Sequence, residues 1–229
     1  MPSILITGAS RGLGLEFARQ YAELGYRVLA VARAPAQSPE LSELARGNSQ
    51  VRLHALDVTD QAGVHALVDT LKGEPIDILL NNAGTMGPKQ QHLGTIDYAG
   101  MVQTLITNTV APLRLAEALT ENVAKSQRKL IVAVTSGMGS IADSSGGFYA
   151  YRASKAALNM SYHNLALDLK PRGITAIVIN PGWVKTDMGG AGAQLEPAQS
   201  ITAMRKVFDA VTLADSGKFM NYSGGTLTW

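Results

Sequence analysis

Several short stretches of the chain are continuously apolar, and this pattern restricts the fold more than any other feature. The segments Ile78–Leu80, Leu130–Val134 and Ala176–Ile179 lack the alternation of apolar and polar residues that a half-exposed strand shows. Strands buried on both faces of a parallel sheet have this continuous pattern. We therefore expect seven strands, at Ser3–Thr7, Arg27–Ala32, Val51–Asp57, Ile76–Asn81, Lys129–Thr135, Thr175–Asn180 and Lys218–Tyr222.

Amphipathic segments with helical periodicity lie between these strands. They cover about residues 12–24, 38–46, 60–72, 97–124, 149–170 and 197–213. A strand–helix repeat with right-handed crossovers is typical of an α/β protein with helices on both faces of its sheet. The sequence contains no linker, low-complexity tract or internal repeat. We expect residues 1–229 to form a single-domain, Rossmann-type, doubly wound parallel sheet of about seven strands.

Composition favours a small-molecule partner over a nucleic acid or a membrane. The formal net charge is +2, without a basic run. No apolar stretch approaches the ~18 residues of a membrane span, and no basic leader precedes an apolar core. Cysteine is absent, and the four histidines (54, 65, 92 and 163) lack metal-site spacing. We expect a cytoplasmic protein without a metal site.

The first predicted strand runs directly into a glycine-rich turn and then into a helix. Gly8, Gly12 and Gly14 let the backbone turn tightly and approach a ligand closely. The following helix directs free N–H groups and the positive end of its dipole toward this turn, which favours a phosphate. The spacing is GxxxGxG rather than the GxGxxG of the dinucleotide fingerprint, and a strand-to-helix turn that binds nothing is the alternative.

The end of the second predicted strand indicates which dinucleotide the chain prefers. An acid is expected there to hold the ribose 2′-hydroxyl, but the chain has Arg33, and the next acid is Glu40. Arg33 can pair with a 2′-phosphate, and Arg11 offers a second cation. These residues predict a preference for NADP(H) over NAD(H). The alternative is that both arginines are solvated surface charges.

Tyr151 and Lys155 have the i, i+4 spacing that places two side chains on one helical face. An isolated tyrosine titrates near ~10, so it is a poor acid–base group at neutral pH. A nearby cation stabilises the phenolate and lowers the pKa of the tyrosine. The pair therefore predicts a proton-transfer device, although many YxxxK pairs are ordinary surface neighbours.

Six motifs together resemble those of the short-chain dehydrogenase/reductase family, over essentially the whole chain. They are, in order, Thr7–Gly14 (TGxxxGxG), Leu56–Val58, Asn81–Gly84 (NNAG), Ser136–Gly139 (SxxG), Tyr151–Lys155 (YxxxK) and Pro181–Gly182. Within the family, the region after Ser136 and the chain after Pro181 look like C-factor-like carbonyl reductases. The resemblance implies a cofactor site formed by Gly8, Ser10, Arg11, Gly12, Leu13, Gly14, Arg33, Asp57, Val58, Asn82, Ala83, Gly84, Tyr151, Lys155, Pro181, Gly182, Val184 and Thr186.

The resemblance also implies hydride transfer between a nicotinamide and a carbonyl or alcohol. Tyr151 would be the general acid/base, Ser136 would hydrogen-bond the substrate oxygen, and Lys155 would lower the Tyr151 pKa and hold the nicotinamide ribose. Ser136 lies 15 residues before Tyr151, slightly more than in many relatives. A helix-capping or turn role is the alternative for Ser136, and Ser140, Ser144 and Ser145 are nearby competitors for its role.

Pro112 lies in the long predicted helix 97–124, four residues after Asn108. A helical proline cannot donate to the carbonyl four residues earlier, which here belongs to Asn108, so we expect a kink or break. The family resemblance implies that Asn108 links Lys155 to solvent through a water. A purely structural kink is the alternative.

The connection Trp183–Pro197 is expected to cover the substrate as a short, mobile lid, with Trp183 and Met188 as an apolar wall. Two other functions remain open. One is a cofactor-binding signalling or regulatory protein with vestigial catalysis. The other is a nucleotide-sugar epimerase or dehydratase, although few residues follow the sixth strand. Relatives in the family pair long helices, so a homodimer or homotetramer is also expected.

Overall fold

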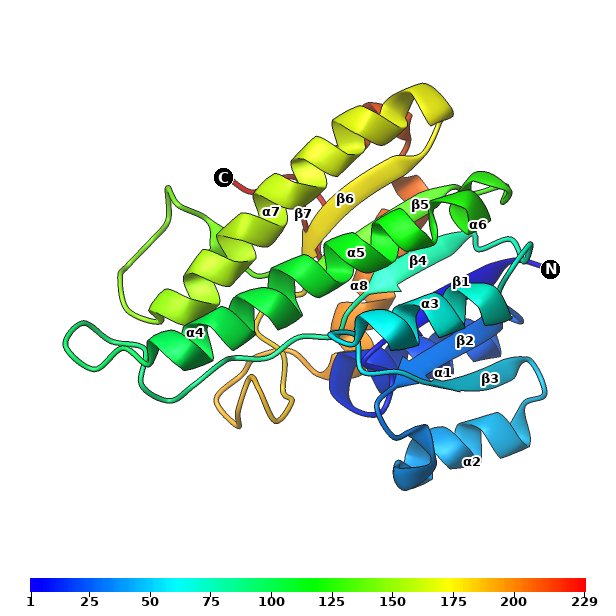
Figure 1. The fold of residues 1–229 in the computed structure, drawn as a ribbon, viewed down its shortest axis with the longest axis horizontal. Helices are drawn as coiled ribbons and strands as arrows, with labels where there is room; N and C mark the ends of the chain where they lie inside the picture. The colour runs from blue at the N-terminus through cyan, green and yellow to red at the C-terminus, as the bar shows by residue number, and fades with distance from the viewer.

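A seven-stranded parallel sheet forms the centre of the computed structural model, which describes residues 1–229 (Figure 1). The strand order is β3-β2-β1-β4-β5-β6-β7. This arrangement confirms the predicted doubly wound α/β fold. The strands are β1 (Ser3–Thr7), β2 (Arg27–Ala32), β3 (Val51–Ala55), β4 (Ile78–Asn81), β5 (Leu130–Val134), β6 (Thr175–Asn180) and β7 (Phe219–Asn221).

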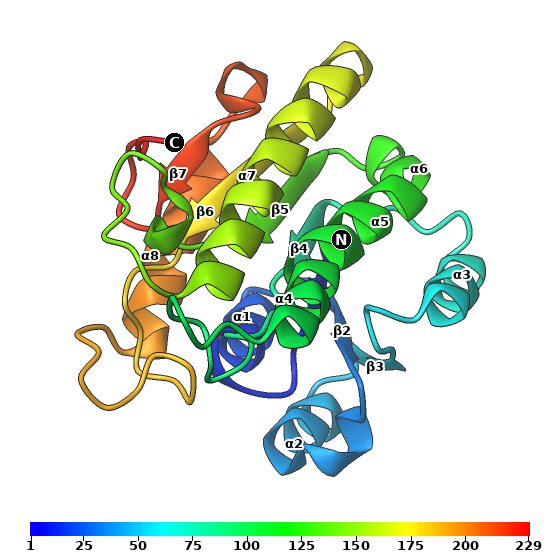
Figure 2. The ribbon, with the colours of Figure 1, turned by 60° about the vertical axis from the view of Figure 1, so that its left-hand side comes forward.

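Helices cover both faces of the sheet because successive strand side chains point to opposite sides (Figure 2). Ile4 and Ile6 of β1 belong to one apolar cluster and Leu5 to the other. The first face packs against α1 (Gly12–Glu23), α2 (Pro39–Gly47) and α8 (Pro197–Ala210). The second face packs against α3 (Gln61–Thr70), α5 (Ala111–Ala118), α6 (Thr120–Ala124) and α7 (Tyr149–Leu169).

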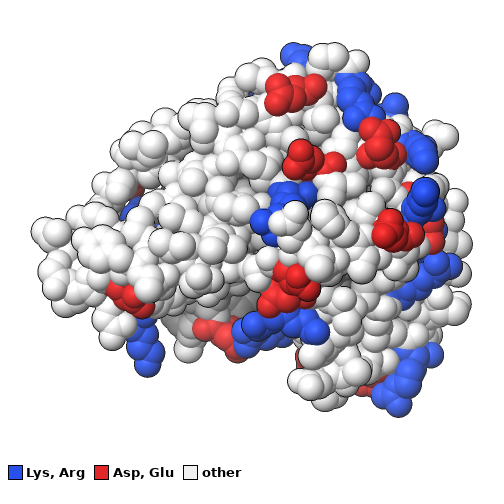
Figure 3. All heavy atoms as spheres, viewed as in Figure 1, with Lys and Arg blue, Asp and Glu red and all other residues white.

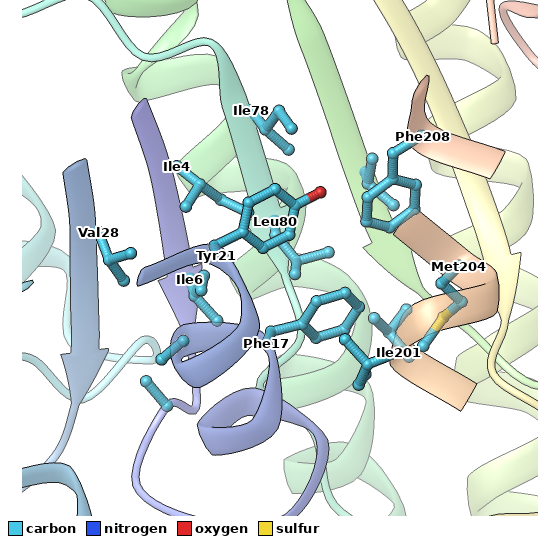
Figure 4. Close-up of a cluster of buried hydrophobic side chains, with 14 of the residues drawn as sticks. Ile4, Ile6, Phe17, Tyr21, Val28, Ile78, Leu80, Ile201, Met204 and Phe208 are labelled. Atoms are coloured by element: carbon cyan, nitrogen blue, oxygen red, sulfur yellow. The ribbon is translucent and has the colours of Figure 1, made fainter. Parts of the chain in front are cut away.

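Aromatic side chains join α1 to α8 in the first cluster. Phe17 stacks on Phe208 with ring centroids 5.9 Å apart and an interplanar angle of 8°. Figure 4 shows these rings beside Tyr21, with Ile201 and Met204 of α8 on the far side from β1. The first strand–helix unit and the last helix are thereby packed together, which holds the start of α1 near the connection before α8.

The predicted helix 97–124 is wrong as a single α-helix. The structure has α4 (Tyr98–Leu105), a π-helical segment at Ile106–Val110, then α5 and α6. Pro112 lies in the first turn of α5 and cannot donate to Asn108 O, so the backbone widens instead of breaking. The N–H of Ala111 bonds to Ile106 O, five residues back. The expected disturbance is therefore present, as a π segment.

Other element ends differ from the expected ones by a few residues. β3 stops at Ala55 because the Asp57 carboxylate accepts from Thr59 N at 2.9 Å and turns the chain. β4 starts at Ile78 because Ile76 N bonds to Asn122 O outside the ladder. α8 ends at Ala210, and a separate 3-10 turn follows at Leu213–Asp215. Strands β5 and β7 are also shorter at both ends than expected.

β1 pairs with both β2 and β4, so chain connections diverge from it to opposite sides of the sheet. In such sheets ligands bind beyond the carboxyl ends of the strands at this switch point.

No helix is long and apolar enough to cross a membrane. Figure 3 shows basic and acidic side chains interspersed on the visible face, with few of either over α4 and the first half of α7.

Candidate active site

Thr7 ties the carboxyl ends of β1 and β4 together. Its Oγ1 accepts hydrogen bonds from Asn82 N and Ala83 N, each at 3.0 Å. Asn82 Nδ2 donates in return to Thr7 O at 2.9 Å. The glycine turn and the NNAG segment, separated by more than 70 residues, therefore form one rigid unit.

The glycine turn packs so closely on itself and on the NNAG segment that larger residues would not fit. Gly8 and Gly12 have positive φ values of 68° and 56°. A Cβ on Gly14 would lie 2.1 Å from Gly8 O, and one on Gly8 would lie 2.9 Å from Ala83 Cα. Arg11, at the N-cap of α1, makes no side-chain cap, so N–H groups of the first turn are free for an anion.

Two other residues of the turn have structural contacts. Ser10 O accepts from Ser38 Oγ at 2.7 Å, and Leu13 packs against the first apolar cluster. These contacts fix the turn from behind. With its uncapped helix N-terminus, the turn can hold an anion such as a phosphate.

The two arginines predicted to select NADP(H) differ in their surroundings. Arg33 is exposed just beyond β2 and makes no ion pair. Hydrogen bonds from Thr59 lower the pKa of Asp57, and the charge of Arg33 lowers this pKa further. Arg33 therefore lies near Asp57, in the predicted adenine turn. Arg11 instead pairs with Asp187 of the 183–197 connection at 2.9 Å, with both side chains over 70% exposed (73% and 78%). Val58 packs against the second cluster.

Tyr151 and Lys155 are buried in the first turns of α7, with 6% and 5% of their surfaces exposed. Lys155 Nζ donates to Val134 O at 2.9 Å, at the end of β5. It lies 5.7 Å from the centroid of the Tyr151 ring. The alternative of a surface pair is therefore wrong.

The expectation that Lys155 lowers the Tyr151 pKa differs from the structure. Burial raises the pKa of Tyr151, and the Ser136 side chain opposes this by hydrogen bonding. Burial also lowers the pKa of Lys155 to about 8, because the ammonium has left water for an apolar environment. The Lys155 ammonium donates to Val134 O, and burial is the larger influence on the Tyr151 pKa.

Ser136 has the capping role that was its alternative, and its hydrogen bond to a substrate oxygen stays a prediction. Its Oγ accepts from Met138 N at 3.1 Å and caps the 3-10 turn Gly137–Gly139. The same side chain lies near the Tyr151 phenol and opposes the rise in its pKa. Asn180 Oδ1, at the end of β6, accepts from Gly137 N at 3.0 Å and fixes this turn. The cap thus orients the serine toward the phenol.

Asn108 lies in the π segment, and its buried side chain is fully engaged. Oδ1 accepts from Thr85 N at 2.8 Å, while Nδ2 donates to Thr85 O at 2.8 Å and to Ser154 Oγ at 3.0 Å. A Cβ on Gly84 would lie 3.3 Å from Asn108 Oδ1 and 3.7 Å from Lys155 Nζ. The π segment, the NNAG segment and α7 therefore meet at Lys155. The water relay through Asn108 stays a prediction.

The connection 183–197 folds back on itself. Val184 and Leu195 form an isolated bridge, and Trp183 Nε1 donates to Gly189 O at 2.8 Å. A Cβ on Gly12 would lie 3.5 Å from Thr186 Cγ2, so Thr186 faces the glycine turn. Before this connection, Ser200 Oγ donates to Pro181 O at 2.6 Å and Gly182 has a φ of 80°. Trp183 and Met188 are exposed, and the expected apolar wall and mobility stay predictions.

Three residues with clear contacts in the site were missed in the sequence. They are Gln91, which bonds Tyr151 N, Asn180, which bonds Gly137 N, and Asp187, which pairs with Arg11. None belongs to a recognised motif. Only knowledge of which loops meet in space would have singled them out.

Known proteins resemble the chain in sequence and structure. Residues 2–196 match the family described as short chain dehydrogenase. The chain is 42% identical to the C-signal of Myxococcus xanthus over 156 residues, which cover 68% of this chain and 93% of that protein. The carbonyl reductase Sniffer of D. melanogaster has a TM-score of 0.92 and 36% identity, with 100% of each chain covered. The NADPH-bound carbonyl reductase from chicken fatty liver has a TM-score of 0.91 and 32% identity, covering 100% of this chain and 99% of that one.

The chain belongs to the short-chain dehydrogenase family, a family of oxidoreductases. The fold, the glycine turn and the buried Tyr151–Lys155 pair are the features that the sequence analysis associated with it. Its structural neighbours include carbonyl reductases, some with a bound nicotinamide dinucleotide.

Burial of Lys155 predicts a pH-dependent stability. The pKa of Lys155 is about 8 in the folded protein against an ordinary value of 10.5. Between these values the unfolded chain binds the extra proton, so the free energy of unfolding rises with pH. The rise due to Lys155 should approach about 3 kcal/mol across this window. Denaturant unfolding of wild type and Lys155→Met at several pH values measures it.

The unfolding free energy of wild type minus that of Lys155→Met should increase as the pH rises from 8 to 10.5, because only the wild type has the buried lysine. Exposed Lys170 offers a matched control, since Lys170→Met should show a constant difference. A constant difference for Lys155→Met as well would contradict the burial argument.

Proposed function

We propose that the protein is an NADPH-dependent carbonyl reductase in which Tyr151 is the general acid/base. One observation carries the proposal: Tyr151, Lys155 and Ser136 are brought together at the end of β5, beside a glycine turn that fits a dinucleotide. The carbonyl reductases among the structural neighbours support this choice of reaction. The substrate is a small molecule that carries a carbonyl or, in the oxidative direction, an alcohol.

The bound dinucleotide would supply the hydride, and the chain's own residues manage the proton. Tyr151 donates its phenolic proton to the carbonyl oxygen as negative charge develops there. Its raised pKa keeps the phenol protonated at neutral pH, which suits the reductive direction. Ser136 donates a hydrogen bond to the same oxygen. Lys155 holds the nicotinamide ribose, and a water at Asn108 returns the proton from solvent.

The proposed cofactor site extends along the carboxyl edge of the sheet from β2 to β6. The uncapped start of α1 would hold the pyrophosphate, and Arg33 would hold the 2′-phosphate. Arg11 would join Arg33 there by leaving its exposed pair with Asp187. Asp57 and Val58 flank the adenine. Pro181, Gly182, Val184 and Thr186 lie on the nicotinamide side, where Thr186 faces Gly12.

Arg33 supplies the first test of cofactor preference. Arg33→Ala should raise the NADPH Kd by roughly tenfold or more, because a charge-assisted hydrogen bond contributes about 1.5–3 kcal/mol. The NADH Kd should change by less than about twofold, since NADH has no 2′-phosphate. Fluorescence titration measures both constants, and Arg172→Ala, at the far end of α7, is the control. Equal NADH and NADPH affinities in wild type would overturn the preference.

Tyr151→Phe tests the proton donor. The variant should lose at least about 10³-fold in kcat for carbonyl reduction, because it retains the ring and lacks the proton. Its NADPH Kd should stay within about threefold of wild type. Tyr149→Phe is the matched control, since Tyr149 starts the same helix, is partly exposed and lacks a lysine one turn later. Retained turnover in Tyr151→Phe would remove the assignment.

The similarity to the C-signal of Myxococcus xanthus favours a second candidate, a cofactor-binding signalling protein with weak reductase activity. Under this hypothesis NADPH binding would matter and proton transfer would not. The assembled set of Asn108, Ser136, Tyr151 and Lys155 argues for catalysis, because binding alone does not require a buried acid. A wild-type protein that binds NADPH tightly yet reduces no carbonyl would favour the signalling role.

We also propose that residues 1–229 form one domain and that the protein self-associates in the cytoplasm. Exposed Val102, Val110, Met160 and Leu167 give α4, the π segment and α7 apolar surface. A homodimer or homotetramer would bury this surface, as expected from the long helices.

A further inference from the structure

Helix α7 carries Tyr151 in its first turn but does not cap its own N-terminus. Gly146, Gly147 and Phe148 precede it with positive φ values of 78°, 65° and 47°. Phe148 occupies the N-cap position in a left-handed conformation and makes no side-chain cap. The first intrahelical bond is Arg152 N to Phe148 O. The N–H groups before Arg152 therefore need partners from elsewhere in the fold.

Gln91 provides two of these partners from the loop between β4 and α4. Its backbone carbonyl accepts from Tyr149 N at 3.0 Å. Its side-chain Oε1 accepts from Tyr151 N at 2.9 Å, in a buried position. Gln91 thus caps α7 from 60 residues earlier in the chain, in the way that a local Ser or Asp caps other helices.

The other end of the Gln91 amide is equally committed. Nε2 donates to Met86 O at 2.9 Å and to Pro88 O at 2.7 Å. The residue is 2% exposed. Rotating the amide would set its NH₂ against Tyr151 N–H and its oxygen against two carbonyls, so only one orientation satisfies all three bonds. The amide is therefore fixed on both sides.

This amide connects the proton donor to the loop that follows the NNAG segment. In the same loop, Thr85 bonds Asn108, and the His92 ring packs edge-on against Phe148 with centroids 5.2 Å apart. First-turn residues of a helix are the ones most prone to open locally. Fixing Tyr151 N therefore keeps the phenol in one place relative to Ser136 and the end of β5.

From this geometry we propose that Gln91 is a positioning residue that holds Tyr151 in its reactive place by capping α7. The inference rests on the proposed reductase function for its kinetic consequence and on the structure alone for the cap. Removing the amide lets the first turn of α7 open and lowers the rate of the chemical step. NADPH binding changes little, because Gln91 does not touch the glycine turn and Lys155 keeps its bond to Val134 O.

Two variants of Gln91 and one matched control test the proposal. Gln91→Met keeps the length of the side chain and removes its three hydrogen bonds. Gln91→Glu keeps an acceptor for Tyr151 N and adds a negative charge that a helix N-terminus favours, while it loses both donors. Gln90→Met makes the same change as the first variant at the adjacent, exposed residue.

The rate of amide hydrogen exchange in the first turn of α7 tests the cap independently of activity. Mass spectrometry of a peptide covering residues 148–155 should show exchange at least about tenfold faster in Gln91→Met, and unchanged in Gln91→Glu and Gln90→Met. In the reductase assay, Gln91→Met should lose about tenfold or more in kcat, with KM and the NADPH Kd within about twofold. Gln91→Glu should recover kcat to within about threefold of wild type, although its melting temperature falls.

Each other outcome counts against the proposal. Unchanged exchange in Gln91→Met overturns the cap, and faster exchange with unchanged kcat overturns the positioning role. If Gln91→Met does not fold, Gln91→Glu decides the positioning role. A tenfold loss of kcat in Gln91→Glu, with residues 148–155 still protected from exchange, overturns that role. If wild type reduces no carbonyl, the proposed function fails, while the exchange result still decides whether Gln91 caps α7.

Discussion

Burial of the strands on both faces is the constraint on which the rest of the structure depends. β1 has no exposed edge and no exposed face, so helices must cover both sides of the sheet and the connections must diverge beside it. That divergence brings the glycine turn next to the NNAG segment, and the Thr7 hydroxyl fixes them there. The buried apolar strands therefore determine both the stability of the sheet and the position of the glycine turn beside the NNAG segment.

The buried polar groups behind the site follow from the same packing. Lys155 reaches the end of β5 only by leaving water, which lowers its pKa, and Tyr151 beside it has a raised pKa for the same reason. Each group is oriented by a partner from another element: Val134 for Lys155, Thr85 for Asn108 and Gln91 for Tyr151. The catalytic apparatus we propose is thus pre-organised by the end of β5 and by the loop between β4 and α4.

The sequence predicted much of this because some residues leave local signals. Continuous apolar runs located central strands such as β4, β5 and β6, and Gly8, Gly12 and Gly14 located the turn between β1 and α1. The π segment was only partly predicted, since Pro112 indicates a disturbance without its geometry. The rise in the Tyr151 pKa by burial was not predicted, because spacing along a helix shows the nearest charge and not the depth of burial. Gln91 left no signal, since its role depends on two loops that meet only in the folded chain.

The central claim is that this site transfers a hydride from NADPH to a carbonyl carbon. The most direct measurement is oxidation of NADPH by the purified protein against a panel of ketones, aldehydes and quinones, with the alcohol product identified by mass spectrometry. The account predicts alcohol formed in equal amount to the NADPH consumed, with incorporation of deuterium from C4-deuterated NADPH at the former carbonyl carbon. Tight NADPH binding without alcohol formation from any carbonyl of the panel would contradict it.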